Sequence, residues 1–301
     1  MTSHANKAAG YFEGWILYFL RNGNLGGTLR ITFLTNRDLA SNFALNLLVP
    51  SLSESHELRV FCSDTVGGKP LEPTLSELTF YEQTLPNELL FPLIDAQRST
   101  GELLTFQGLG DYLSSAVASL NEPNTPRGHA TLAANAPDLI VSVRYGCILE
   151  VPTISIASKG ALNLHSGKLP DYRGVMTTCR AMLAGDAELC STLHWIDDTG
   201  IDTGPIISIQ ATHRNPAQCY LANTLGLYPS GCAALLDAIE TISTGGSLPV
   251  IPSDAPAQYY SFPDAPTIAA FQAASFRWVD TVFLTRFIRR YLPKELTPIL
   301  P

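Results

Sequence analysis

The chain has 301 residues, of which 46% are hydrophobic and 15% charged, with a formal net charge of -8 and a pI near 5.2. This composition predicts a globular protein with a sizeable core and disfavours a disordered chain. The acidic balance also disfavours a nucleic-acid partner, because binding to phosphates needs clustered lysine and arginine side chains.

The six cysteines are scattered, and none belongs to a Cys-x-x-Cys pair or lies near a histidine at metal-ligand spacing. We therefore interpret them as reduced core residues and expect no metal. The apolar run 15–20 is too short to span a bilayer, and no basic-then-apolar leader opens the sequence. The expectation is a cytoplasmic protein without a membrane partner.

Aromatic and apolar residues recur at near-helical spacing between Tyr11 and Leu20. This pattern predicts a helix that packs on the body of the protein or on a second copy of the chain, so a homodimer is one interpretation. Residues 1–27 are accordingly assigned to an N-terminal extension.

The next elements read as strand, helix and strand, at residues 29–35, 39–52 and 57–62. This order is typical of a parallel sheet whose helices cover its faces. The first turn, residues 35–38, contains no glycine, whereas a dinucleotide-binding domain needs Gly-x-Gly-x-x-Gly there. Binding of NAD is therefore disfavoured.

Residues 67–126 are predicted to be irregular because prolines interrupt them, with one helix expected at 109–120. The predicted core domain covers 28–215, and 216–301 is expected to pack on it as a helical or irregular extension. Further elements are predicted as follows: a buried strand and turn in 136–149, a strand at 153–157, a helix at 176–183, strands at 191–196 and 206–209, a helical stretch 216–243 interrupted at 225–229, and an amphipathic run at 276–292.

The stretch 161–207 holds the chemically informative residues. Apolar and polar residues alternate from Leu162 to His165, which on a strand places Asn163 and His165 on one face. An amide that donates a hydrogen bond, beside an imidazole that moves a proton near neutral pH, suits addition to a carbonyl. Asp202 follows in a glycine-rich turn from which it could reach the imidazole. His194 is interpreted as a structural strand residue.

Motifs around these residues resemble the folate-dependent formyltransferases, the family of glycinamide ribonucleotide transformylase and methionyl-tRNA formyltransferase. The resemblance covers residues 136–210. It is carried by Asn163-Leu164-His165 and by the runs 137–149, 169–174, 184–186 and 200–205 in this order. The resemblance implies an α/β, Rossmann-like formyltransferase fold with a mostly parallel central sheet and helices on both faces.

The same resemblance implies formyl transfer from 10-formyltetrahydrofolate to an amine or hydroxylamine nitrogen, without a metal. Asn163 would donate a hydrogen bond to the oxyanion, His165 would share that task and move the proton, and Asp202 would orient His165. The pterin ring of the folate would lie between two turns and contact Tyr145, Gly146, Cys147, Ile148, Leu149, Trp195, Ile196, Asp198, Gly200 and Ile201.

One departure from the family pattern lies beside the expected acceptor site. The commonest residues after the histidine are Pro-Ser, whereas this chain has Ser166 and Gly167. The altered turn resembles that of the specialised small-amine members. Arg173 is a candidate for holding a carboxylate of the acceptor, with a structural role in its turn as the alternative.

Four functions follow as hypotheses. The leading one is an N5-hydroxyornithine transformylase of siderophore biosynthesis, and the next is an N-formyltransferase for a sugar-nucleotide amine. A hydrolase that releases formate from the same folate would use a nearly identical trio of residues. A folate-binding module without catalysis is the fourth hypothesis, against which the intact trio argues.

Overall fold

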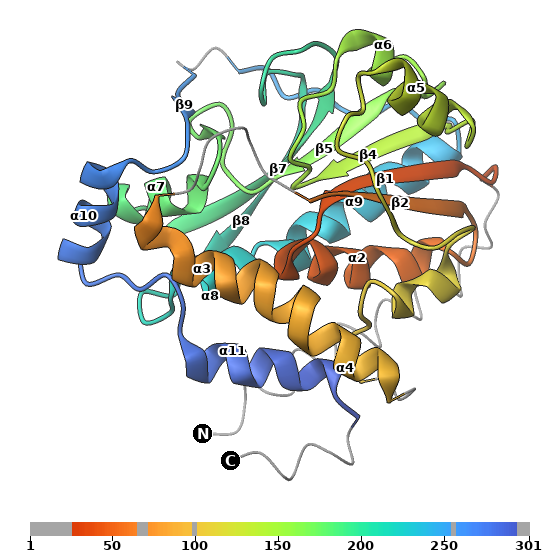
Figure 1. Cartoon of the computed structure of the whole chain (residues 1–301). Coiled ribbons are helices and arrows are strands. Elements are labelled where there is room, and N and C mark those ends of the chain that lie inside the picture. Colours follow the sequence, from red (N-terminus) through yellow and green to blue (C-terminus); the bar gives the residue numbers. More distant parts are fainter. Residues whose placement is uncertain (1–25, 65–71, 98–100, 254–256, 294–301) are drawn as a thin grey trace, which may run out of the picture.

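The computed structural model describes residues 26–64, 72–97, 101–253 and 257–293. At its centre is a seven-stranded sheet with the strand order β3-β2-β1-β4-β5-β7-β8 (Figure 1). The first five of these strands run parallel, and β7 and β8 are antiparallel to their neighbours. The strands are β1 (Arg30–Asn36), β2 (Glu57–Ser63), β3 (Ala118–Ser119), β4 (Leu139–Val143), β5 (Ala161–His165), β7 (Glu188–Ile196) and β8 (Ile206–His213). The predicted, mostly parallel α/β sheet is confirmed.

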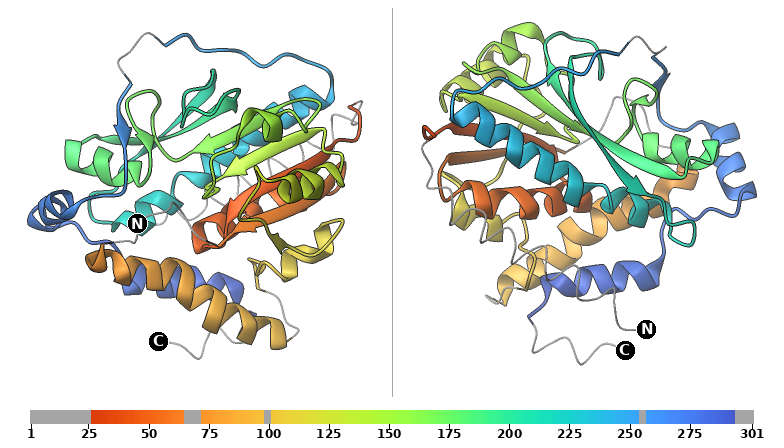
Figure 2. Two further views of the ribbon diagram at one scale, coloured as in Figure 1. Left: turned by 45° about the horizontal axis from the view of Figure 1, so that its top comes forward. Right: turned by 180° about the vertical axis from the view of Figure 1, so that it is seen from behind.

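Both faces of the sheet are covered by helices because buried apolar side chains leave each strand on both sides. Along β1, Phe33 enters one hydrophobic cluster and Leu34 the other. The larger cluster lies under helices α2 (Leu39–Leu52), α8 (Tyr220–Leu225) and α9 (Tyr228–Ser243), and α2 and α9 run side by side in Figure 2. The smaller one lies under α5 (Pro126–Ala133) and α6 (Val151–Ile154).

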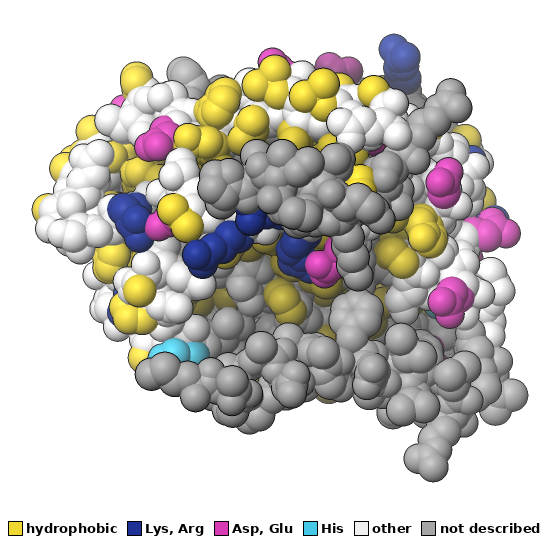
Figure 3. Space-filling view, turned by 90° about the horizontal axis from the view of Figure 1, so that it is seen from below, with side chains coloured by type: hydrophobic (Ala, Val, Ile, Leu, Met, Phe, Trp, Pro, Cys, Tyr) yellow, Lys and Arg dark blue, Asp and Glu magenta, His cyan; other side chains and the backbone are white. Residues whose placement is uncertain are grey.

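An outer helical layer covers α2 on the side away from the sheet (Figures 1 and 2). It pairs a continuous helical run, residues 73–96, with a C-terminal helix. Aromatic contacts join the layers: Phe43 of α2 meets Phe287 with ring centroids 5.1 Å apart, and the Tyr291 hydroxyl donates to Asn42 Oδ1 over 2.7 Å. Seen from below, the described part of the surface shows basic and acidic side chains among hydrophobic ones (Figure 3). The run 73–96 consists of η1 (Pro73–Leu75), α3 (Ser76–Thr79), the π-helical η2 (Phe80–Leu90) and α4 (Phe91–Ala96). The C-terminal helix consists of α11 (Thr281–Ile288) and η4 (Arg289–Tyr291).

The helical run 73–96 corrects the prediction that residues 67–126 are irregular, insofar as they are described. Pro73 and Pro92 occupy first-turn positions of their helices, where a missing N–H removes no hydrogen bond. Pro86 lies inside the π-helical stretch, and its carbonyl accepts a hydrogen bond from the Phe91 amide. These prolines therefore lie at the start of a helix or inside one and do not end it.

Two other predicted elements are wrong. The helix expected at 109–120 is replaced by the 3₁₀ turn η3 (Gly108–Tyr112) and the short strand β3. The strand expected at 153–157 is replaced by the end of α6 and the turn that follows it; α6 begins at Val151 with Pro152 in its first turn. The β-branched residues suggested a strand there, but the proline favours a helix start.

The remaining described elements agree with their predicted types. Helix α7 (Thr177–Ala184) agrees with the predicted helix 176–183 to within one residue at each end. Helix α11 is shorter than the predicted amphipathic run 276–292 because Asp280 caps its N-terminus. A small second sheet pairs β6 (Arg173–Gly174) with β9 (Tyr259–Tyr260), and α10 (Ala265–Ala273) follows it. The predicted N-terminal helix lies outside the described residues. Within the described ranges, no helix has the length and apolar character needed to cross a membrane.

Candidate active site

A cavity of about 1010 Å³ opens where the carboxyl ends of β1, β4 and β5 meet, the usual location of ligand sites in open α/β sheets. Asn36, Arg144 and His165 reach it from the ends of these three strands. Asn163, Asp202 and all ten residues predicted to contact the pterin also line it. Residues predicted from separate motifs therefore meet in one space.

Strand β5 places two of the proposed catalytic side chains as the alternating pattern predicts. Leu162 and Leu164 are buried in the larger hydrophobic cluster, 0% and 3% exposed, which fixes the register of the strand. Asn163 and His165 consequently face the cavity.

Asp202 links these side chains. Its Oδ1 accepts a hydrogen bond from the Asn163 amide over 3.2 Å, and its Oδ2 lies 3.4 Å from His165 Nδ1. Oδ2 also accepts from the backbone amide of Gly174 over 2.8 Å. Burial alone would raise the pKa of Asp202, but the charge of His165 and the hydrogen bond and charge of His194 outweigh it and lower the pKa to about 2. The carboxylate is therefore ionised throughout the neutral range.

His165 is held at both ring nitrogens. Nε2 lies 2.7 Å from the Tyr172 carbonyl oxygen, and Nδ1 faces Asp202, so both nitrogens face oxygen acceptors. Gly167 completes this arrangement, because a Cβ there would lie 2.6 Å from His165 Nε2 and 2.7 Å from the Thr177 hydroxyl. Gly167 is thus required for the tight turn over the imidazole, which explains part of the departure from Pro-Ser.

The structure brings His194 into the centre of the site. Its Nδ1 lies 2.8 Å from the Trp195 carbonyl oxygen, and since a carbonyl only accepts, Nδ1 carries a hydrogen. In the neutral ring Nε2 accepts a hydrogen bond from the Asn163 amide, 3.0 Å away, whereas in the protonated ring Nε2 carries a hydrogen that faces Asp202 Oδ1, 3.4 Å away. The protonated ring is the form that lowers the pKa of Asp202. His194 orients Asn163, a role that sequence analysis missed.

The role of His194 depends on the pairing of β5 with β7, which the sequence alone does not show. In the antiparallel register Asn163 lies directly opposite His194. Alternation along 191–196 indicates a strand, but it does not reveal which residue faces which neighbour. Both amide hydrogens of Asn163 are aimed at His194 and Asp202, so binding an oxyanion requires one of them to turn to the new acceptor.

The turn at 145–149 is fixed by the neighbouring segment of the chain. Gly146 N donates to Ser63 Oγ over 2.9 Å, and the Asn124 amide donates to the Ile148 carbonyl over 2.8 Å. The Tyr145 hydroxyl donates to the Leu120 carbonyl. Ile148 is 52% exposed and lines the cavity, so its apolar side chain is available to a flat ring.

The opposite turn, 197–204, is shaped by glycine and an Asx-type bond. Asp198 Oδ1 accepts from Gly200 N over 2.7 Å and from the Thr203 hydroxyl over 2.9 Å, and a Cβ at Gly200 would overlap that hydroxyl. The Asp198 side chain thus stabilises its own turn. Arg173 Nε donates to the Ile201 carbonyl over 2.8 Å and braces the same turn.

Among the three predicted acceptor contacts, only Ser166 lines the large cavity, whereas Gly167 and Arg173 do not. Arg173 is committed to the Ile201 carbonyl, and this geometry favours the structural alternative for its role. A role of Arg173 in binding a carboxylate of the acceptor stays a prediction.

A buried ionic cluster at the cavity was not predicted. Arg144 Nη2 lies 3.1 Å from Asp38 Oδ2 and 3.6 Å from Glu82 Oε1, with side chains 19%, 1% and 10% exposed, respectively. Burial raises the pKa of Glu82 to about 7, with Arg144 opposing the rise. These residues lie more than 40 positions apart in the sequence, so no local motif signals the cluster.

Comparison with known proteins agrees with the resemblance to folate-dependent formyltransferases. Residues 114–218 match the family model described as formyl transferase. The match spans β3 to β8 and contains Asn163, His165, His194 and Asp202. In the part of the chain that the structure describes, no group of three His, Cys, Asp or Glu residues is arranged to hold a metal ion.

The relatives extend this assignment. A methionyl-tRNA formyltransferase of Aromatoleum aromaticum is 32% identical over 178 residues, which cover 58% of this chain and 54% of that protein. The chain thus spans about half the length of this curated relative. Two solved structures share the formyltransferase fold: a sugar N-formyltransferase from Shewanella sp FDAARGOS_354 (14% identity, TM-score 0.51, 81% of this chain and 79% of that chain) and glycinamide ribonucleotide transformylase 1 from Symbiobacterium toebii (17%, 0.51, 74% and 90%).

Proposed function

We propose that the chain transfers a formyl group from 10-formyltetrahydrofolate to the amine or hydroxylamine nitrogen of a small acceptor. The observation that carries this proposal is the hydrogen-bonded arrangement of Asn163, His165 and Asp202 in one cavity of the formyltransferase domain. An amide donor, an imidazole and an ionised carboxylate are the groups that carbonyl addition requires.

The folate supplies an electrophilic formyl carbon, to which the acceptor nitrogen bonds as the bond to the folate nitrogen breaks. Asn163 and His165 each turn one N–H group from its present acceptor and donate it to the carbonyl oxygen as this oxygen gains negative charge. Asp202, which is ionised because its pKa is low, keeps His165 oriented and relays to it the proton lost by the acceptor nitrogen. His165 or water returns a proton to the folate nitrogen, so the transfer is balanced.

The turns at 145–149 and 195–202 are proposed to hold the pterin ring. Support comes from their shared position on the cavity wall and from the exposed apolar side chain of Ile148. The cavity volume of about 1010 Å³ lies at the top of the range of roughly 300–1,000 Å³ for single small-molecule sites. It leaves room for an acceptor beside the folate.

N5-hydroxyornithine, in siderophore biosynthesis, is proposed as the acceptor. The net charge of -8 and the scarcity of basic side chains at the cavity favour a small amino acid over a nucleic acid. The relationship to methionyl-tRNA formyltransferases and the fold shared with a sugar N-formyltransferase make methionyl-tRNA and sugar-nucleotide amines the alternatives to test.

The test incubates the purified protein with 10-formyltetrahydrofolate and, separately, N5-hydroxyornithine, ornithine, amino-sugar nucleotides, methionyl-tRNA or no acceptor. Release of tetrahydrofolate and the mass of the product are followed. A formylated product with one acceptor supports the transferase. Formate in the tube without acceptor identifies a hydrolase, and folate binding without any turnover identifies a binding module.

A further inference from the structure

Glu82 lines the cavity from outside the central sheet. It belongs to the helical run 73–96, is only 8% exposed, and lines the cavity that contains Asn163, His165 and Asp202. Its Oε1 accepts no hydrogen bond from the residues that the structure describes. Less than 1 Å² of this oxygen is accessible, so a ligand in the cavity would meet the part of the Glu82 carboxyl group that lines the cavity wall.

Arg144 does not donate a hydrogen bond to Glu82. Both Nε and Nη2 of Arg144 lie 3.1 Å from Asp38 Oδ2, whereas Glu82 Oε1 is 3.6 Å from Nη2, beyond hydrogen-bonding distance. Asp38 and Glu82 are two acids facing one guanidinium. The cluster therefore has one more acidic than basic group.

The cluster also lies beside the catalytic strand. Val143 of β4 pairs with Leu164 of β5, so Arg144 and His165 are the next residues along two neighbouring strands. Adjacent strands are roughly 5 Å apart. Glu82, in contact with Arg144, is consequently close to the end of the cavity where transfer would occur.

The charge of the whole cavity points to one class of acceptor. The acidic side chains among its described lining residues are Asp64, Glu82, Glu122, Asp197, Asp198 and Asp202. Arg144 is the only lysine or arginine among those same residues. Phosphate groups are bound by lysine, arginine or free helix N-termini, so this lining disfavours a phosphate-bearing acceptor.

The N-terminus of α2, at the same end of the sheet, is already capped. Asp38 Oδ1 accepts from Ser41 N over 2.7 Å, and Oδ2 accepts from the Asn36 amide over 2.9 Å. Asp38 is 1% exposed. A carboxylate of the chain itself thus occupies the place where an anion could bind the helix.

We propose that Glu82 binds an ammonium group of the acceptor, one that is not formylated, and that the acceptor is a small cationic amine without phosphate. This inference rests on the proposed formyl transfer and adds the acceptor subsite to it. In N5-hydroxyornithine, the α-ammonium group would meet Glu82 while the hydroxylamine nitrogen faces Asn163 and His165. The ammonium would donate a hydrogen bond to the Glu82 carboxylate from the cavity.

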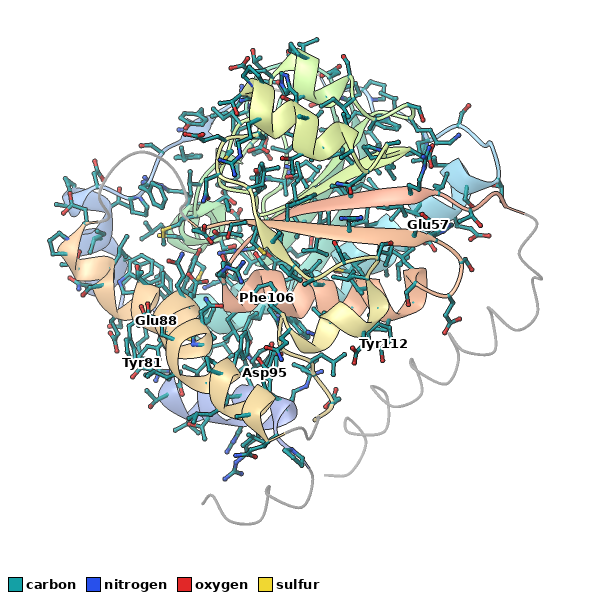
Figure 4. All side chains as sticks on the ribbon, turned by 45° about the vertical axis from the view of Figure 1, so that its right-hand side comes forward. Glu57, Tyr81, Glu88, Asp95, Phe106 and Tyr112 are labelled. Carbon is teal, nitrogen blue, oxygen red and sulfur yellow. The ribbon has the colours of Figure 1, made fainter. Side chains whose placement is uncertain are left out.

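The experiment compares two acceptors, N5-hydroxy-L-ornithine and 5-(hydroxyamino)pentanoate, which lacks the α-ammonium group. Steady-state transfer from 10-formyltetrahydrofolate is measured for the wild type, for Glu82→Gln and for the control Glu88→Gln. Glu88 belongs to the same helical run but is exposed and does not line the cavity (Figure 4). Thermal unfolding and binding of 5-formyltetrahydrofolate show whether each variant is folded and still binds folate.

A charge-assisted hydrogen bond predicts that the wild type prefers N5-hydroxy-L-ornithine by about 10- to 100-fold in kcat/KM. Glu82→Gln should raise the KM for this acceptor by a similar factor, leave the analogue unaffected and so remove the preference, whereas Glu88→Gln should match the wild type. Equal use of both acceptors by the wild type, or equal losses with both in Glu82→Gln, would overturn the proposal. The wild-type comparison stands even if the variant fails to fold.

Failure of the subsite and failure of the proposed function give different results. If the wild type formylates an amino-sugar nucleotide or methionyl-tRNA but neither hydroxylamine, formyl transfer stands and the role of Glu82 is overturned. If no acceptor in the panel is formylated and 5-formyltetrahydrofolate does not bind, the proposed function itself is overturned.

Discussion

The two walls of the cavity differ in how their polar groups are satisfied. On the wall formed by β5, β7 and the 197–204 turn, Asn163, His165, His194 and Asp202 bond to one another or to backbone groups. On the wall formed by the helical run 73–96, Glu82 keeps a buried oxygen without a donor. The first wall is preorganised for one reaction whatever the acceptor, and the second is left open for a particular ligand.

The first prediction concerns His194, which holds Asn163 on the wall formed by β5 and β7. His194→Ala removes the acceptor that holds the Asn163 amide, so kcat should fall about 10- to 100-fold through misplacement of Asn163, with little change in KM for folate. His194→Gln, which keeps an acceptor, should recover part of the loss. His213→Ala, at an exposed histidine of β8, is the matched control and should leave kcat unchanged. An unchanged kcat in His194→Ala would show that the catalytic position of Asn163 does not depend on His194.

A smaller effect is expected at the turn over His165. Gly167→Ala introduces a methyl group 2.6 Å from His165 Nε2, so the imidazole must move and kcat should fall about 10-fold. The control is Gly110→Ala, because a Cβ at Gly110 meets no atom within 4 Å. Activity is measured by tetrahydrofolate release, and equal kcat values for both variants would contradict the positioning role of Gly167.

A further prediction concerns stability and not activity. The pKa of Asp202 is lowered to about 2, so its ionised form stabilises the fold by about 2 kcal/mol above the ordinary pKa of 3.8, and this contribution is lost as pH falls towards 2. Urea unfolding of wild type and Asp202→Asn should therefore differ by about 2 kcal/mol at pH 7 and by less at pH 3. A difference that does not shrink at pH 3 would mean that the carboxylate charge is not its source.

Local patterns predicted the first wall well. The buried leucines that flank Asn163 fix the register of β5, and glycine positions around Asp202 define its turn within a short stretch of sequence. The strand, helix and strand at the start of the core domain were equally clear, because each is a continuous apolar or periodic run. These features depend on neighbours that are close in the chain.

The second wall depends on distant neighbours and was missed. Pro86 suggested an irregular segment, yet the residue lies in the π-helical stretch that carries Glu82. The ionic cluster joins that stretch to Asp38 and Arg144, and its existence follows only from tertiary packing. His194 was overlooked for the same reason, since its partner across the sheet is 31 residues away.

The most direct test of formyl transfer by this site is a single-turnover measurement with Asn163→Ala. Protein saturated with 10-formyltetrahydrofolate is mixed with N5-hydroxy-L-ornithine, and the formylated product is quantified by mass against time. The account predicts transfer by the wild type and a rate roughly 10²–10³-fold lower in the variant, with 5-formyltetrahydrofolate binding retained. Equal rates in the two proteins would contradict the assignment of Asn163 and of the wall around it.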